Sequence, residues 1–246
     1  MKDFKVRGLI INEMAIGESD KRIVIYSKEK GKIQVFAKGA RKTKSEFLAG
    51  TQLFSYCDFV LVKNRNSITI SQISIIESFY NIRQDIYKLS YAMYAMELLE
   101  YIGLENENNY ELLKLTLKTL SAISNNIINI KLIIGIYEIK IMSLSGYKPQ
   151  LYKCVICEEE ENTFSNFSSK YGGVLCSKCK NKDYNTSRIS TSTLYSMKFV
   201  IESDLVNLFS FNVSDKILEE IVYLSNDFIR IHLDKNFKTK EYIKSL

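Results

Sequence analysis

The sequence predicts an α+β fold, in which a small N-terminal β-barrel is followed by an α-helical domain with a cysteine-containing insertion. Three observations predict it. The first 80 residues carry β-branched and aromatic residues in short runs, as strands do. Hydrophobic residues after that point recur at helical spacing, and two cysteine pairs interrupt the helical part. The predicted domains are residues 1–80, 81–149, 150–185 and 186–246.

The barrel is predicted from strand-like segments separated by turns such as Lys30-Gly31 and Asn64-Arg65-Asn66. In the last segment the apolar alternation slips by one residue at Gln72. A slip reverses the buried face of a strand, so we expect a β-bulge there. Short strands with a bulge in a basic domain favour a closed barrel of the OB type, with an SH3-like barrel as the alternative. The predicted strands cover residues 5–12, 22–27, 32–37, 53–62 and 67–76.

The helical domain is predicted from apolar stripes at the helical period, which we expect to form its core. The first stripe ends before Gly103, and Ser214 is expected to cap the last helix. The first stripe consists of Ile82, Ile86, Leu89, Met93 and Met96. The stripe of the last helix consists of Ile217, Ile221, Leu224, Phe228 and Ile231. The other predicted helices cover residues 110–124, 129–145 and 190–203, and the last covers 214–233.

The net charge of the chain is confined to its first third. Residues 1–80 hold 14 of the 34 Lys and Arg but only 8 of the 28 Asp and Glu, a net charge of +6. The remaining residues hold 20 of each and are neutral. This asymmetry is typical of a module that binds a polyanion, attached to a neutral scaffold.

Four cysteines have the spacing of a zinc site. Cys154 and Cys157 form one Cys-x-x-Cys pair, and Cys176 and Cys179 form another after eighteen residues. Two such turns can complete a tetrahedron of thiolates around one zinc ion, with no position left for water. We therefore expect one structural zinc per chain in a zinc-ribbon insertion. Redox-active pairs and unligated thiols are the alternatives, and Cys57 is expected to be a small buried hydrophobe.

A basic segment is the candidate nucleic-acid contact. Residues 38–44 contain four cations and no acid, in a loop between the third and fourth predicted strands. We expect it to bind phosphates in a salt-dependent way. A solvated loop is the alternative. The candidate contact residues are Lys38, Arg41, Lys42 and Lys44 in the loop, extended by Arg7, Lys21 and Arg22 on neighbouring segments, with Lys5, Lys63 and Arg65 as further candidates. Phe36, Phe47 and Tyr56 are available for base stacking, although each fits the core equally well.

Catalytic motifs are absent from the sequence. It contains no P-loop, no GxGxxG after a strand, no HExxH motif and no nucleophile elbow, and its single histidine, His232, is expected to be interfacial or exposed. We therefore expect a non-enzymatic protein. No apolar segment is long enough to span a bilayer and the first residues lack a signal-peptide pattern, so we expect a cytoplasmic protein with reduced cysteines and no membrane partner.

The sequence resembles the RecO family of bacterial recombination mediators. The resemblance rests on short motifs in family order along nearly the whole chain. In the first 80 residues these motifs are Arg7 to Ile10, Gly17 to Asp20, Lys38 to Lys42 with Ser45, Gly50 to Phe54, and Glu77. Beyond residue 80 they are Tyr137 to Lys140, Gly146 to Pro149, the first cysteine pair, Phe164, and Gly172 to Cys176.

The resemblance implies an N-terminal OB fold, a helical domain with a zinc ribbon, and the DNA-contact role of the 38–44 loop. It also implies binding of single- and double-stranded DNA in the nucleoid, annealing of complementary strands, and partnership with RecR. It further implies loading of RecA onto DNA coated by single-stranded DNA-binding protein (SSB), whose acidic tail is a partner. An RNA-binding OB and zinc-ribbon protein of translation or transcription is the alternative. An enzyme with an architectural zinc, such as a nuclease or methyltransferase, is a further one.

Overall fold

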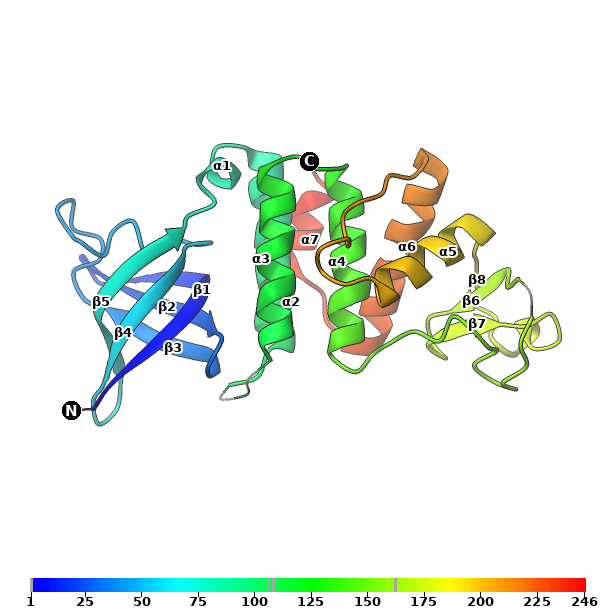
Figure 1. The fold of residues 1–246 in the computed structure, drawn as a ribbon, viewed down its shortest axis with the longest axis horizontal. Coiled ribbons are helices and arrows are strands. Elements are labelled where there is room, and N and C mark those ends of the chain that lie inside the picture. The colour runs from blue at the N-terminus through cyan, green and yellow to red at the C-terminus, as the bar shows by residue number, and fades with distance from the viewer. Residues whose placement is uncertain (1, 106, 108, 162) are drawn as a thin grey trace. The chain divides into compact units, whose positions relative to one another are not determined.

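The computed structural model describes residues 2–105, 107, 109–161 and 163–246 (Figure 1). The chain forms two compact units. The first comprises Met1–Ser124 together with Thr239–Leu246, and the second comprises Asn125–Lys238. No helix in the described ranges is both long and apolar enough to cross a membrane.

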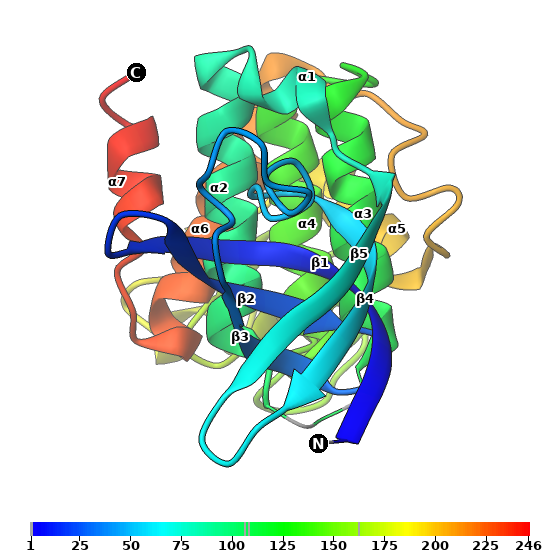
Figure 2. The same ribbon diagram turned by 90° about the vertical axis from the view of Figure 1, so that its left-hand side faces the viewer.

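The first unit begins with a closed β-barrel, seen face-on in Figure 2. Its strands are β1 (Lys2–Ile16), β2 (Asp20–Ser27), β3 (Gly31–Ala37), β4 (Tyr56–Lys63) and β5 (Ile68–Glu77). The strand order is β1-β2-β3-β5-β4. Because β3 pairs in parallel with β5, and β4 returns antiparallel beside β1, the order is a Greek key and not a meander. The predicted α+β class and OB-type barrel are confirmed.

The barrel core follows from the alternation of inward- and outward-pointing side chains along the strands. Ile23 and Ile25 of β2 and Val35 of β3 point inward and are fully buried. The predicted bulge in β5 is confirmed, because Val60 pairs with Gln72 while its neighbour Leu61 pairs with Ile70. Past the bulge Ile73 packs against the core, whereas Ile75 is 45% exposed next to a second irregularity in the same strand pair.

Helices α1 (Tyr80–Arg83), α2 (Ile86–Ile102) and α3 (Tyr110–Ser124) complete most of the first unit, and α7 (Lys238–Ile243) begins at its boundary. The barrel is fixed to the C-terminal half of α2 by hydrogen bonds. The Asn12 amide donates to both carboxylate oxygens of Glu100 at 3.1 and 2.8 Å, and Lys32 Nζ donates to the Glu100 carbonyl at 2.8 Å. Gly103 lies against the buried Tyr26 ring, where a larger residue would collide with it.

The first predicted helical stripe is wrong in two respects. The chain breaks between α1 and α2, where the Asp85 side chain caps α2 by accepting from the Tyr87 and Lys88 backbone N–H groups. Ile86 and Met93 are 50% and 38% exposed, not buried. The physical reason is that α2 is apolar on most of its circumference, so the helical period marks no single face.

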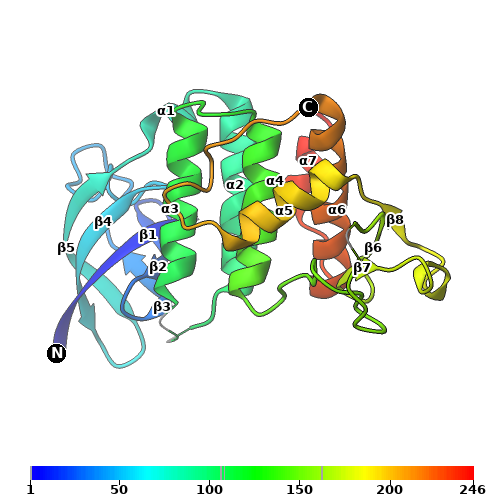
Figure 3. The same cartoon turned by 45° about the vertical axis from the view of Figure 1, so that its right-hand side comes forward.

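The second unit consists of three packed helices with a small sheet at one side of them (Figure 1 and Figure 3). Its helices are α4 (Ile130–Leu144), α5 (Thr191–Glu202) and α6 (Asp215–Leu233). Ser214 occupies the predicted N-cap position of α6, but its side chain makes no capping hydrogen bond. Ile231 of the predicted stripe is 36% exposed, whereas Leu224 and Phe228 are buried as predicted. The sheet has the order β7-β6-β8, with β6 (Asn166–Ser168), β7 (Gly173–Leu175) and β8 (Ser187–Arg188), and the 3-10 turn η1 (Lys180–Lys182) lies between β7 and β8.

A buried lysine on α4 holds the end of α5. Lys140 is 7% exposed and donates from Nζ to the carbonyl oxygens of Ile201 and Ser203, at 2.8 and 2.7 Å. These carbonyls have no partner within the helix, so the lysine satisfies them. Burial lowers the pKa of Lys140 from its ordinary value.

Candidate metal centre and nucleic-acid interface

The four predicted cysteines meet at one point of the second unit. The Sγ atoms of Cys154, Cys157, Cys176 and Cys179 all lie within 4.8 Å of one another. Cys157 is exposed and the other three are buried. The first pair lies in the turn that follows Leu151, and the second lies between β7 and η1.

The sulfur geometry fits a tetrahedral metal ion. Four thiolates at about 2.3 Å from one zinc ion lie about 3.8 Å from one another. The Sγ atoms of Cys157 and Cys176 are 3.6 Å apart, which matches that edge and is far longer than a disulfide bond. All five cysteines are free thiols. The cluster can therefore hold a metal ion.

The backbone prepares one of these sulfurs for ionisation. Burial opposes ionisation of Cys154, but the backbone N–H groups of Cys176, Cys157 and Ile156 outweigh it and lower the pKa of the thiol to about 6. By contrast, burial and hydrogen bonds to the neighbouring sulfurs raise the pKa of Cys179 to about 12. A metal ion replaces the protons of such thiols, so its binding releases protons.

The acidic run after the first cysteine pair ties the two cysteine turns together. Glu159 accepts from Lys178 Nζ at 2.9 and 3.0 Å, and Glu161 accepts from the Ser177 backbone N–H and hydroxyl at 3.1 and 2.9 Å. Glu158 pairs with Lys153 at 2.9 Å. The run is exposed but not merely solvated, because its carboxylates hold the second turn at a fixed distance from the first.

The ribbon is anchored on α6 by the single histidine, on the side of the molecule that comes forward in Figure 3. His232 is half-buried, and its Nε2 lies 2.8 Å from the Ser169 carbonyl oxygen. Its ring packs on Phe228 with centroids 4.2 Å apart, and Phe228 in turn contacts Phe167 of β6 at 6.1 Å. The predicted interfacial position of His232 is confirmed. Its contacts with Ser169 and Phe228 give it a structural role.

The basic loop is held on the barrel by a buried alanine and an aspartate. Ala40 is fully buried in the barrel core, whereas Lys38, Arg41, Lys42 and Lys44 are exposed. The Asp20 carboxylate accepts from the Gly39 backbone N–H at 2.8 Å, which holds the pKa of Asp20 below its usual value, helped by the Ser19 hydroxyl. The loop backbone is therefore anchored on the barrel, and its cationic side chains are exposed.

Of the loop cations, Arg41 is partly committed to the fold. Its Nη1 donates to the Gly17 carbonyl at 2.9 Å. Within the described part of the chain, no carboxylate lies within ion-pair distance of Lys38, Lys42 or Lys44. Those three side chains are available to a ligand.

The three candidates outside the loop differ in their surroundings. Lys21 is only 14% exposed, pairs with Glu13 at 2.6 Å, and also donates to the Thr51 carbonyl. Arg22 lies beside the loop on the outer face of the barrel and contacts Met14 Sδ at 3.3 Å, and its cross-strand neighbour Phe36 is half-buried. The strand register therefore places Arg22 near the loop. It also places Lys21 next to Glu13, which neutralises its charge.

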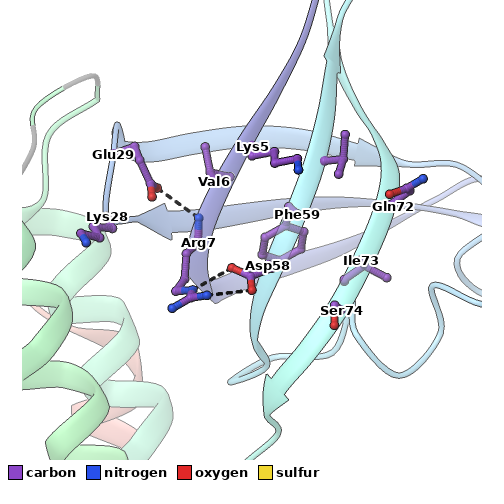
Figure 4. A pocket seen from close by; sticks show the side chains of 11 residues that line it. Lys5, Val6, Arg7, Lys28, Glu29, Asp58, Phe59, Gln72, Ile73 and Ser74 are labelled. Carbon is purple, nitrogen blue, oxygen red and sulfur yellow. Dashed lines mark hydrogen bonds and ion pairs between the residues drawn. The ribbon is translucent and has the colours of Figure 1, made fainter.

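Arg7 of β1 lies beside the last residues of β2, whereas the basic loop lies beside the first residues of β2. Arg7 lines a separate groove of about 490 Å³ (Figure 4). Its guanidinium donates to both carboxylate oxygens of Asp58 at 2.7 and 2.9 Å, and this contact holds the pKa of Asp58 below its usual value. Lys5 and Lys28 line the same groove. Lys28 was not among the candidates from the sequence, because its place in this groove depends on the turn between β2 and β3.

Together these features define a class of protein: an OB-type barrel with a fixed basic loop, joined to a helical unit with a four-cysteine metal centre. The family model described as Recombination protein O N terminal matches residues 1–79, and Recombination protein O C terminal matches residues 83–241. The chain belongs to the RecO family of DNA repair proteins.

Relatives match along their full length. The DNA repair protein RecO of Acetivibrio thermocellus is 37% identical over 246 residues, which cover 100% of this chain and 98% of the relative. The DNA repair protein RecO of Alkaliphilus metalliredigens is 37% identical over 243 residues, covering 98% of this chain and 99% of the relative. That of a Thermoanaerobacter species is 33% identical over 246 residues, covering 100% and 99%.

Proposed function

We propose that this protein is a non-enzymatic recombination mediator that binds single- and double-stranded DNA and anneals complementary strands. With RecR it helps load RecA onto single-stranded DNA coated by SSB, whose acidic tail it binds. It acts in the cytoplasm, associated with the nucleoid. Membership of the RecO family supports this function, since the relatives are named DNA repair proteins.

The observation that carries the proposal is the basic loop. Lys38, Lys42 and Lys44 are exposed side chains on a loop fixed by Ala40 and Asp20. A loop whose backbone is already ordered loses little backbone entropy when its cations meet phosphates. Arg22 and Phe36 extend this surface onto the barrel.

The annealing mechanism follows from electrostatics. Two DNA strands repel each other through their phosphates, and a protein that neutralises phosphates on both lowers that repulsion. Base pairing then supplies the driving force, so the reaction requires no nucleotide hydrolysis. This agrees with the absence of a P-loop from the sequence.

The metal is proposed to be zinc with an architectural role. Four thiolates would fill its coordination sphere, so it would supply folding energy to the ribbon and no chemistry. Cys154, Cys157, Cys176 and Cys179 would hold it.

The test is annealing of complementary oligonucleotides without nucleotide. The triple variant Lys38→Ala/Arg41→Ala/Lys42→Ala is expected to lose most of the activity of the wild type, and the slope of log K against log salt for single strands should fall by roughly 2. Arg41 also holds Gly17, so Lys38→Ala/Lys42→Ala/Lys44→Ala serves as a second variant without that structural role.

A folded wild type that anneals no strands at any salt concentration would refute the mediator function. Tighter binding to RNA than to DNA would favour the alternative of a translation or transcription protein.

A further inference from the structure

The segment of the cysteine ribbon from residue 180 to residue 188 carries three exposed cations and a projecting aromatic ring. Tyr184, which follows η1, is 98% exposed. Lys180, Lys182 and Arg188 on the same segment are exposed, and none has a carboxylate within ion-pair distance among the residues that the structure describes. We call Lys180, Lys182, Tyr184 and Arg188 the ribbon edge.

The position of Tyr184 is fixed by its buried neighbour. Asp183 is 7% exposed, and its two carboxylate oxygens accept from the Ser168 hydroxyl at 2.5 Å and from the Asn185 backbone N–H at 3.0 Å. The Lys182 backbone N–H donates to the Cys179 carbonyl at 2.9 Å. The chain on the N-terminal side of Tyr184 is thus tied to β6 and to a cysteine turn. The ring projects into water from an ordered turn.

Charges within the ribbon are segregated. The carboxylates of Glu158 and Glu159 are paired with Lys153 and Lys178, and Glu161 is bonded to Ser177. The acids are therefore used between the two cysteine turns. The ribbon edge itself carries three exposed cations against the one buried carboxylate of Asp183.

A hollow of about 660 Å³ continues from the ribbon edge. Asn185 lines it directly after Tyr184, Lys170 lines it from the ribbon, and Tyr223 and Arg230 line it from α6. Tyr223 is 60% exposed. Asp183 and Asp227 line it too, and Asp227 pairs with Arg230 at 2.6 Å, so the hollow adds a second aromatic ring and the cation of Lys170 but no net positive charge.

This combination matches the chemistry of an unpaired nucleic-acid strand. Proteins that bind single strands pair cations, which follow the phosphates, with exposed aromatic rings on which bases stack. Bases inside a duplex are already stacked on both faces, so only its two ends could offer a free face to Tyr184. A folded protein partner fits less well, because lysines are depleted at the centre of protein interfaces.

We propose that the ribbon edge is a second binding surface for single-stranded nucleic acid, in which Tyr184 stacks on an unpaired base while Lys180, Lys182 and Arg188 contact phosphates. The proposal rests on the proposed function of the chain in binding nucleic acid. It adds a surface in the second unit to the basic loop of the first. A chain with one surface in each unit can hold two strands at once.

The first test uses the absence of tryptophan from the chain. The variant Tyr184→Trp carries a single tryptophan whose fluorescence reports stacking. Addition of an oligothymidylate should quench it, whereas a blunt duplex should quench it much less. The matched control is Tyr195→Trp on α5, where the tyrosine is 68% exposed, and its fluorescence should not change. A silent Tyr184→Trp under conditions where the oligonucleotide is bound, or equal quenching by duplex, would overturn the proposal.

The second test measures affinity. Tyr184→Ala should weaken single-strand binding about five-fold or more, the effect of losing one base stack. Lys180→Ala/Lys182→Ala/Arg188→Ala should lower the slope of log K against log salt by about 2. Bound zinc and melting temperature, measured on each variant, establish that the ribbon is intact. If the wild type binds no DNA, the proposed function fails. If it binds and both variants match it in affinity and salt slope, the ribbon edge alone is refuted.

Discussion

Cations of the barrel that look alike in the sequence have different neighbours in the fold. Lys21 is neutralised by Glu13, and Arg7 by Asp58 on the adjacent strand, whereas Lys42 of the loop is exposed. The composition of residues 1–80 identifies these residues as a basic set. Strand register decides which of them meets a carboxylate, and register depends on pairing between distant segments. The cysteines were easier to place, because their spacing is local.

The contact of Asp20 with Gly39 is expected to control the order of the basic loop. Asp20→Ala should speed amide exchange at Gly39, because the N–H loses its acceptor. Asp20→Asn should have a smaller effect, since an amide oxygen still accepts. Hydrogen exchange followed by NMR measures both, with the core amide of Ile25 as the unchanged reference. Equal exchange at Gly39 in the wild type and Asp20→Ala would contradict the assignment.

The same contact should weaken in acid. The pKa of Asp20 is lowered in the folded state below its ordinary value of 3.8. A lowered carboxylate pKa contributes stability that is present in full above the ordinary value and is lost as the pH falls through the folded value. Protection of the Gly39 amide should therefore decline below about pH 4, before the barrel core opens. Unchanged protection through that range would contradict the ionised form of Asp20 as the acceptor.

At the scale of elements, features that depend on the local sequence could be predicted. The buried face of a helix could not, because it depends on packing against other elements. The bulge near Gln72 follows from a change of phase that is visible in the sequence. Helix α3 spans Tyr110–Ser124, in agreement with the predicted 110–124. The buried face of α2 could not be predicted, because apolar residues surround the helix and the neighbouring elements decide which of them are covered. Exposed Ile86 and Met93 are the result.

The cysteine ribbon is expected to depend on its metal. Strands β6 and β7 have three residues each, too few to form a stable sheet without further support. Removal of the metal by a chelator should release one zinc ion per chain and unfold residues 150–185. Amide exchange should rise in β6 and β7 but not at Ile25 of the barrel, and added zinc should restore protection. Native protection of β6 and β7 in the metal-free chain would contradict this prediction.

At the scale of the whole molecule, the first unit is discontinuous in sequence. Residues 239–246 belong with residues 1–124, although the second unit separates them along the chain. The Glu97 carboxylate of α2 accepts from the backbone N–H and hydroxyl of Thr239 at 3.1 and 2.5 Å, and Lys240 Nζ donates to Tyr94 OH at 3.0 Å. The sequence pattern of the last residues does not predict this return, because the periodicity of a six-residue helix does not show which distant element it packs against.

Truncation after Lys238 should therefore destabilise the first unit selectively. Loss of the hydrogen bonds to Glu97 and Tyr94 is expected to lower its free energy of unfolding by about 1–3 kcal/mol. Native-state hydrogen exchange separates the units, with β2 amides reporting the first and α6 amides the second. Thr239→Val, which removes only the hydroxyl, should reproduce part of the loss. Equal destabilisation of both units, or of the second alone, would contradict the assignment.

The return of the chain to α2 also sets an order of events during translation. The barrel, α2 and α3 leave the ribosome first, and residues 125–238 follow before α7 is synthesised. The nascent first unit therefore leaves the α2 surface around Tyr94 and Glu97 without its partner while residues 125–238 are synthesised, and its folding is completed only after α7 has emerged.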